Sequence, residues 1–131
     1  MAQVKRPLSP HLQVYRWGAH MAASIINRMT GVALSVGTIL LTWWLVAIAT
    51  GYEYFNTIQG YADSAFGRLV LFGITYALMQ HFAGGIRHLF MDAGKMYDLK
   101  SNTLSAKLTF VFAIVATLAI WIAAYKVMGR L

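Results

Sequence analysis

The chain has 131 residues, of which 59% are hydrophobic and 11% are charged, and it contains no cysteine. Soluble domains carry about 25% charged residues, and a domain this small has too little interior to bury so many apolar side chains. The composition therefore indicates a lipid bilayer as the solvent. The lack of cysteine excludes disulfides, thiolate catalysis, iron–sulfur clusters held by this chain and covalently attached c-type haem.

The formal net charge of +7 would suggest a nucleic-acid partner in a soluble protein. Here the Lys and Arg residues flank apolar runs, where such side chains retain cytoplasmic loops and contact anionic lipid headgroups. The charge pattern therefore favours the lipid bilayer as the partner, and no nucleic acid.

Three uncharged apolar runs predict an all-α integral membrane protein with three transmembrane helices. Each run is at least 18 residues long, close to the roughly 20 residues that a helix needs to span a bilayer. Only a helix or a closed barrel satisfies its backbone hydrogen bonds in lipid. We expect a single membrane-anchor domain, residues 1–131, with helices over about 21–51, 65–91 and 105–128.

Loop charges predict how these helices are oriented. Four Lys or Arg residues lie around the N-terminal arm and four around the second loop, against one in the first loop and two in the C-terminal tail. Because cytoplasmic loops carry the excess of Lys and Arg, we expect a cytoplasmic N-terminal arm and a periplasmic C-terminus. The start of the chain resembles neither a signal peptide nor a transit peptide, so we expect the bacterial cell inner membrane.

The first predicted helix begins with polar residues at helical spacing. Ser24 and Arg28 are four residues apart, and Trp17 precedes Ser24 by seven, so they share one side of the helix. One interpretation is a cationic flank with an interfacial tryptophan. The other is a polar niche with a hydroxyl, a guanidinium and an aromatic wall, which fits a small apolar ligand with carbonyl oxygens, such as a quinone.

The second predicted helix carries ionisable side chains near its end. His81 and His88 are seven residues apart, a rotation of about 700°, so they share a face roughly 10 Å apart. An ionisable residue inside the membrane is a candidate functional residue, although polar side chains also form hydrogen bonds between helices. Arg87 and His88 lie nearer the cytoplasmic interface, where they extend to headgroups or pair with acidic ligand groups.

Two glycines, Gly84 and Gly85, follow His81 at i+3 and i+4 and leave bare backbone beside the imidazole. This patch allows another helix to pack closely, or it gives a large planar group, such as a haem ligated by His81, the clearance it needs. His81 and His88 cannot both ligate one haem from one face of one helix. A second axial ligand would therefore come from a partner chain.

The third predicted helix has no charged residue in its apolar run. His81 is then the one ionisable group other than tyrosine that lies deep in any of the three uncharged runs. A transporter or pore would place charged residues deep in several spans, so this class of function is disfavoured.

Three motifs carry a resemblance to a known family. They read RPLSPHLQVY at residues 6–15, SIINRMTG at 24–31 and HFAGGIRHLFMDAGK at 81–95. In their order, their spacing and the three spans around them, they resemble the cytochrome b membrane-anchor subunit of succinate dehydrogenase (complex II) in its alphaproteobacterial and mitochondrial form. The resemblance covers nearly the whole chain.

The resemblance implies a membrane anchor that binds haem b, passes electrons from an iron–sulfur subunit to ubiquinone and forms part of the quinone site. The implied partners are a second small membrane-anchor subunit, which supplies the other haem ligand, an iron–sulfur subunit, and an FAD flavoprotein subunit that oxidises succinate. The chain would be a subunit of succinate:ubiquinone oxidoreductase without being its catalytic chain. The alternative is a haem-less structural anchor of the same or a related quinone oxidoreductase.

By position, the resemblance also assigns roles to single residues. His81 matches the axial ligand of the haem iron. Ser24 and Arg28 match the serine and arginine that bind quinone, and Ile25 and Trp17 match apolar walls of that pocket.

On the propionate side of the haem, the resemblance assigns Arg28, Arg87 and His88. The chain departs from the family's S-I-x-H-R pattern, because Asn27 stands where the histidine is usual. Asparagine donates hydrogen bonds but carries no charge. A charged contact or a proton-transfer role is therefore not expected at that position.

Overall fold

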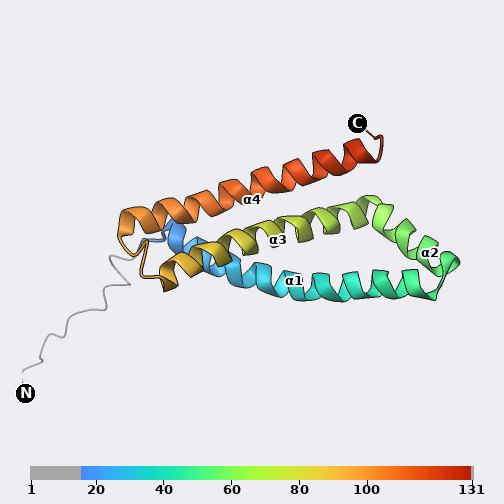
Figure 1. The fold of residues 1–131 in the computed structure, drawn as a ribbon, viewed down its shortest axis with the longest axis horizontal. Helices are drawn as coiled ribbons and strands as arrows, with labels where there is room; N and C mark the ends of the chain where they lie inside the picture. Colours follow the sequence, from blue (N-terminus) through green and yellow to red (C-terminus); the bar gives the residue numbers. More distant parts are fainter. Residues whose placement is uncertain (1–15, 131) are drawn as a thin grey trace, which may run out of the picture.

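The computed structural model describes residues 16–130, which form helices and no strand. Figure 1 shows the four helices in chain order: α1 (Ala19–Thr50), α2 (Tyr52–Asp63), α3 (Ala65–Asp92) and α4 (Leu99–Val127). The RPLSPHLQVY motif and the rest of the expected N-terminal arm before residue 16 lie outside the described residues.

The prediction of an all-α membrane protein with three transmembrane helices is confirmed. α1, α3 and α4 have 32, 28 and 29 residues, and each is long and apolar enough to cross a bilayer. α4 begins six residues before the expected boundary of 105. Asp98 accounts for this early start, because its carboxylate accepts a hydrogen bond from the Ser101 N–H at 2.9 Å and so caps the first turn.

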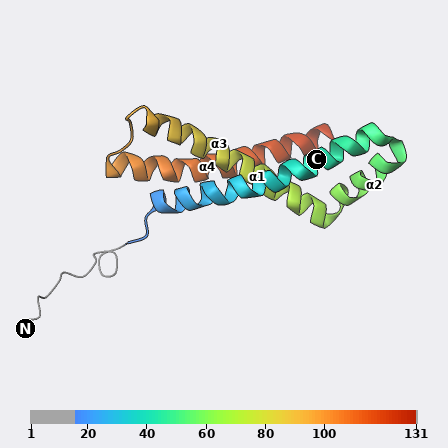
Figure 2. The ribbon, with the colours of Figure 1, turned by 90° about the horizontal axis from the view of Figure 1, so that it is seen from below.

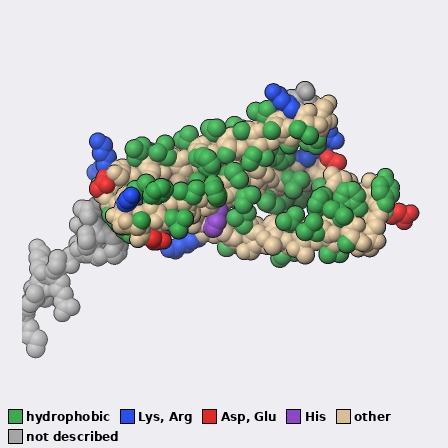
Figure 3. Space-filling view, viewed as in Figure 1, with side chains coloured by type: hydrophobic (Ala, Val, Ile, Leu, Met, Phe, Trp, Pro, Cys, Tyr) green, Lys and Arg blue, Asp and Glu red, His purple; other side chains and the backbone are tan. Residues whose placement is uncertain are grey.

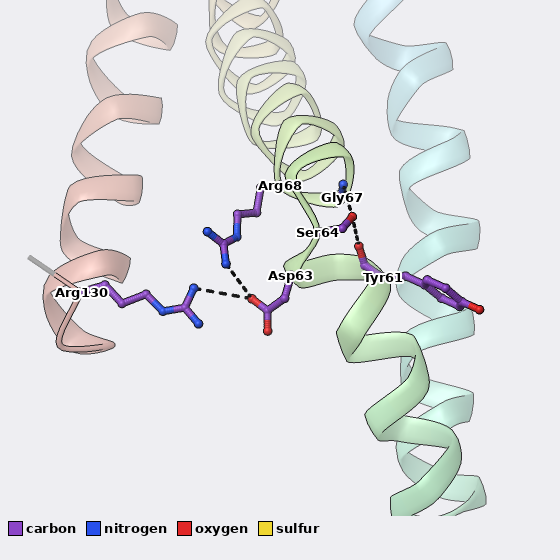
Figure 4. Close-up of polar contacts among 6 residues, drawn as sticks. All are labelled: Tyr61, Asp63, Ser64, Gly67, Arg68 and Arg130. Carbon is purple, nitrogen blue, oxygen red and sulfur yellow. Dashed lines mark hydrogen bonds and ion pairs between the residues drawn. The ribbon is translucent and has the colours of Figure 1, made fainter.

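The short helix α2 was not expected from the apolar pattern. α1 ends at Thr50, and the next residue, Gly51, has a φ of 138°, a conformation that favours glycine. At the other end of α2, the Ser64 hydroxyl donates to the Tyr61 carbonyl at 2.7 Å and accepts from the Gly67 N–H at 3.0 Å (Figure 4). α2 thereby connects α1 to α3 at the end of the molecule where these two helices diverge (Figure 1).

The three long helices run alternately up and down, with α3 between α1 and α4 in Figure 1. The turned view in Figure 2 shows that α1 and α3 cross at an angle. The crossing is close because glycines of α1 face α3: a Cβ built on Gly37 would lie 3.2 Å from the Ile74 side chain. Small residues that let two backbones approach are typical of helix contacts in membranes.

The described core consists of small side chains. The buried apolar residues are six alanines and one isoleucine, and the buried polar ones include three threonines and Gln80. Large hydrophobic side chains instead cover the outside along the length of the helices, as the space-filling view in Figure 3 shows. This inverted distribution suits a protein whose outer surface contacts lipid or other membrane subunits.

The two ends of the bundle differ in charge. At the end near α2, Asp63 lies 3.7 Å from both Arg68 and Arg130, which reach it from α3 and from beyond α4 (Figure 4). Among the described residues, that end carries three cations and two carboxylates, whereas the opposite end carries six cations and two carboxylates. The excess of positive charge therefore lies at the end where α1 begins and α3 ends.

Candidate functional site

Where α1 crosses α3, α1 packs against one side of His81. His81 is half-buried on α3, and a Cβ built on Gly31 of α1 would lie 3.3 Å from Cε1 of the imidazole ring. Gly31 is the last residue of the SIINRMTG motif, so two of the three motifs meet at this point. The ring lies against α1 because Gly31 has no side chain to displace it.

The Nδ1 atom of His81 is held by α1. It lies 3.1 Å from the backbone oxygen of Asn27 and 3.3 Å from the Thr30 hydroxyl oxygen. The Thr30 hydroxyl is itself 2.9 Å from the carbonyl oxygens of Ile26 and Asn27, to which it donates. Since a carbonyl oxygen only accepts, Nδ1 carries the proton, and the neutral ring presents its lone pair at Nε2.

The free nitrogen makes His81 a suitable axial ligand. Among residues 16–130, no group forms a hydrogen bond with Nε2. A metal-binding histidine usually donates its other N–H to a carbonyl or carboxylate, which fixes the tautomer and the ring orientation. Within the same range, no cluster of three or more His, Asp or Glu side chains is placed to hold a metal ion. The donor set of residues 16–130 therefore fits one ligand to a haem iron rather than a complete metal-ion site.

Two interpretations of His81 were open from the sequence, and the structure bears on both. The hydrogen bond between helices is present, because Nδ1 binds α1. It engages only one of the two ring nitrogens, so it leaves metal ligation by the other nitrogen open. Ligation of haem iron by His81 remains a prediction.

Gly84 and Gly85, which the sequence pairs, lie in different surroundings. A Cβ on Gly84 would overlap the Asn27 side-chain oxygen and lie 3.1 Å from its Cγ. Gly84 therefore has the helix-packing role. A Cβ on Gly85 would meet nothing within 4 Å, so only this second glycine offers open space beside the histidine.

Arg87 points toward α4. Its side chain is buried at 7% exposure, and it donates from Nε to Ser105 at 3.1 Å and from Nη2 to Asn102 at 2.6 Å. His88, on the face shared with His81, is exposed and has no hydrogen-bond partner among residues 16–130. The propionate role of Arg87 stays a prediction, and these two bonds within the chain do not favour it.

The predicted quinone-site residues lie along the start of α1. Ser24 is half-buried, Arg28 is exposed, and the exposed fractions of Ile25 and Trp17 are 42% and 60%. Ser24 precedes Asn27 and Gly31, which contact α3 at Gly84 and His81. At about 1.5 Å of rise per residue, Ser24 lies roughly 5–10 Å along α1 from these contacts.

Ser24 differs from the other hydroxyl side chains of α1. Five of them donate to the carbonyl four residues earlier in the helix, namely Thr30, Ser35, Thr38, Thr42 and Thr50. Ser24 makes no hydrogen bond with any residue in 16–130, and neither does the Arg28 side chain. A hydroxyl and a guanidinium are therefore available to a ligand on neighbouring turns.

Several partners of these residues could not be read from the sequence. Asn27 acts through its backbone oxygen, which no side-chain pattern reveals. Thr30 and Asn102 become neighbours of His81 and Arg87 only through the crossing of separate helices. The spacing of Asn27, Thr30 and Gly31 within one motif is the one available signal, since i, i+3 and i+4 share a helix face.

Comparisons with known proteins agree with this architecture. The family model of succinate dehydrogenase/fumarate reductase transmembrane subunits matches residues 2–120. The chain is 43% identical over 102 residues to the succinate dehydrogenase cytochrome b556 subunit of Paracoccus denitrificans, covering 78% of each chain. It is 35% identical over 118 residues to the same subunit of Rickettsia felis, covering 90% of this chain and 92% of the relative. The mitochondrial cytochrome b560 subunit of Sus scrofa is 34% identical over 119 residues, with 88% and 69% covered.

Proposed function

The chain belongs to the succinate dehydrogenase/fumarate reductase transmembrane subunit family, and we propose that it is the haem b-binding membrane anchor of a succinate:ubiquinone oxidoreductase. In this role it forms part of the site where electrons from an iron–sulfur subunit reach ubiquinone. The relatives are named as cytochrome b556 and b560 subunits, which supports a b-type haem.

The observation that carries the haem assignment is the state of the His81 ring. Nδ1 donates to the Asn27 carbonyl at 3.1 Å, so the lone pair at Nε2 is oriented before any ligand arrives. This hydrogen bond also makes the imidazole a stronger donor to a metal. When bound, a b-type haem would supply one-electron transfer. His81 provides one imidazole, and a histidine of the second membrane-anchor subunit provides the other.

Two cationic or polar side chains remain available for the haem propionates. Arg28 on α1 and His88 on α3 are both exposed, and both belong to the electropositive end of the bundle. Arg28 can bind a carboxylate through two N–H groups at once. Arg87 instead holds α3 against α4 through Asn102 and Ser105, so we assign the propionates to Arg28 and His88 first.

The quinone site is assigned to the start of α1. Ser24 donates its free hydroxyl to a quinone carbonyl, because no carbonyl of its own helix accepts it, unlike the other five hydroxyls of α1. Arg28 stabilises negative charge that develops on the quinone oxygen during reduction. Ile25 and Trp17, both exposed in this chain, form the apolar wall for the ring.

The exposed apolar surface and the charge of the two bundle ends support the remaining partners. The exposed large side chains along the three spans contact lipid and a second small membrane-anchor subunit. The electropositive end, which carries the quinone residues, faces the cytoplasm and meets the iron–sulfur subunit, which itself binds the FAD flavoprotein subunit. The end with Asp63, Arg68 and Arg130 then lies on the periplasmic side of the bacterial inner membrane.

The test is made on the purified complex. We expect a b-type absorption band after dithionite reduction; a complex without it would leave the chain as a haem-less anchor. We expect Ser24→Ala to slow quinone reduction about 2- to 10-fold, the loss of one neutral hydrogen bond, and Arg28→Ala about 10- to 100-fold.

Succinate oxidation by an artificial acceptor at the flavin or the clusters should be unchanged in both variants. Ser35→Ala is the matched control, since this hydroxyl lies on α1 and donates to Gly31 of its own helix. Quinone reduction at the wild-type rate in both Ser24→Ala and Arg28→Ala would refute the quinone site.

A further inference from the structure

We propose that the contact between Asn27 and Gly84 positions the His81 imidazole by fixing how closely α1 approaches α3. This inference rests on the proposed ligation of haem iron by His81 and adds a positioning role for two residues that do not themselves touch the iron. It assigns Gly84 to the spacing of two helices rather than to clearance for the haem.

Two contacts of Asn27 with α3 lie within one turn of each helix. The Asn27 side chain packs on the bare backbone of Gly84, where a Cβ would overlap Oδ1 and lie 3.1 Å from Cγ. The backbone oxygen of the same Asn27 accepts from His81 Nδ1 at 3.1 Å. One residue of α1 thus contacts α3 both at Gly84 and at His81, so the two contacts cannot change independently.

The fit at Gly84 depends on the size of both side chains. Oδ1 of Asn27 is buried and has no hydrogen-bond partner among residues 16–130, so steric fit rather than hydrogen bonding holds the amide there. Turning the amide about χ2 relieves the overlap at Oδ1 but leaves Cγ in place. Moving Cγ requires a different χ1 rotamer, and a helix restricts that choice. A methyl group at position 84 therefore pushes the two helices apart.

Separation of the helices acts on the histidine. It lengthens the bond between Nδ1 and the Asn27 oxygen, and a weaker bond makes the ring a weaker donor to iron. Weaker donation stabilises the ferric state less, so the midpoint potential of the haem becomes more positive. Gly31, whose missing side chain admits the ring edge at Cε1, allows the ring to lie against α1.

The experiment uses four variants in the purified complex, with two measurements on each: the haem midpoint potential and the thermal midpoint of the complex. Gly84→Ala is expected to shift the potential to more positive values and to lower the thermal midpoint. Gly73→Ala is the matched control, because Gly73 lies on the same helix as Gly84 and a Cβ built there would meet nothing within 4 Å.

Asn27→Ala and the double variant Asn27→Ala/Gly84→Ala test the cause of that shift. Truncation of Asn27 retains the backbone oxygen that accepts from His81, and in the double variant the new Cβ lies 3.7 Å from the Cβ of residue 27, an ordinary contact. We expect the double variant to return both measurements toward wild type, and Asn27→Ala alone to shift the potential less than Gly84→Ala does, because it opens space at the contact without adding a group that separates the helices. If the Gly84→Ala complex assembles poorly, recovery of assembly in the double variant would support the inference equally.

The outcomes separate this inference from the proposed function. A wild-type complex with b-type haem in which Gly84→Ala matches Gly73→Ala would overturn the positioning role alone. A shift that the double variant fails to reverse would show that Asn27 is not its cause. A wild-type complex without b-type haem would refute the proposed ligation, and the ligand-positioning role with it.

Discussion

Arg87 offers the sharpest prediction about how the helices are held together. Replacing it with alanine removes the bonds from Nε to Ser105 and from Nη2 to Asn102, at 3.1 and 2.6 Å. Hydrogen bonds between membrane helices average about 0.6 kcal/mol each, and bonds from a charged donor reach about 1.5–3 kcal/mol. Loss of the buried charge returns part of its desolvation cost. We therefore expect Arg87→Ala to lower the free energy of unfolding by about 1–3 kcal/mol.

A double-mutant cycle with Asn102→Ala isolates the shorter bond. The assay is denaturant or thermal unfolding of the complex in detergent, followed by the four tryptophans of the chain together with a probe on a partner subunit. We expect a coupling energy of about 1 kcal/mol between the two positions. Lys107→Ala is the matched control, because Lys107 is an exposed cation on α4 with no partner among residues 16–130, and it should change stability little. Additive effects of Arg87→Ala and Asn102→Ala would refute the assigned contact, and unchanged stability with lost haem would instead support the propionate role.

Three further predictions concern other polar groups. Gln80 is 1% exposed, and its Oε1 has no partner in the described residues. Its Nε2 donates to the Thr109 hydroxyl at 3.3 Å, and Thr109 keeps its own bond to the Ala106 carbonyl without it. Gln80→Leu should therefore leave the unfolding free energy within about 1 kcal/mol or raise it, and a fall above about 2 kcal/mol would contradict this. Asp63 is half-exposed in both of its ion pairs, so Asp63→Asn should cost less than about 1 kcal/mol, and a larger cost in the same unfolding assay would disprove it. The hydrogen bond from the Ser101 N–H lowers the pKa of Asp98 below that of a free aspartate. Its stabilisation of α4 is therefore fully present above the ordinary pKa of aspartate and is lost as the pH falls through the lowered pKa. The protection factor of the Ser101 amide, which is its exchange rate corrected for the intrinsic rate at each pH, should therefore fall in acid, and Asp98→Asn should abolish that fall.

The spans were predictable from sequence because lipid imposes a length and a composition that local residues must meet. The uncharged runs alone located α1, α3 and α4. The helix α2 was not predictable in the same way, because its 12 residues mix polar and apolar side chains in the loop between two spans. The early start of α4 depends on Asp98 as a cap, a local signal that the apolar pattern does not contain.

The candidate site was predictable only in part, for a physical reason. Helical spacing places His81 and His88 on one face and Arg87 one residue round from it, since the rotation per residue is fixed. Which helix each face meets depends on the crossing of α1 and α3, which spacing along one helix does not determine. The contact of Gly84 with Asn27 and the turn of Arg87 toward Asn102 both follow from that crossing.

The central claim is that Nε2 of His81 ligates the haem iron, and the spectrum of a His81→Ala complex tests it most directly. His88→Ala is the matched control, since it lies on the same face of the same helix but is exposed and has no bond to α1 in the described chain. The account predicts that His81→Ala loses the low-spin b-type spectrum or the haem itself, whereas His88→Ala retains a low-spin spectrum even if its haem is bound less tightly. A His81→Ala complex with full haem content and an unchanged low-spin spectrum would contradict the account.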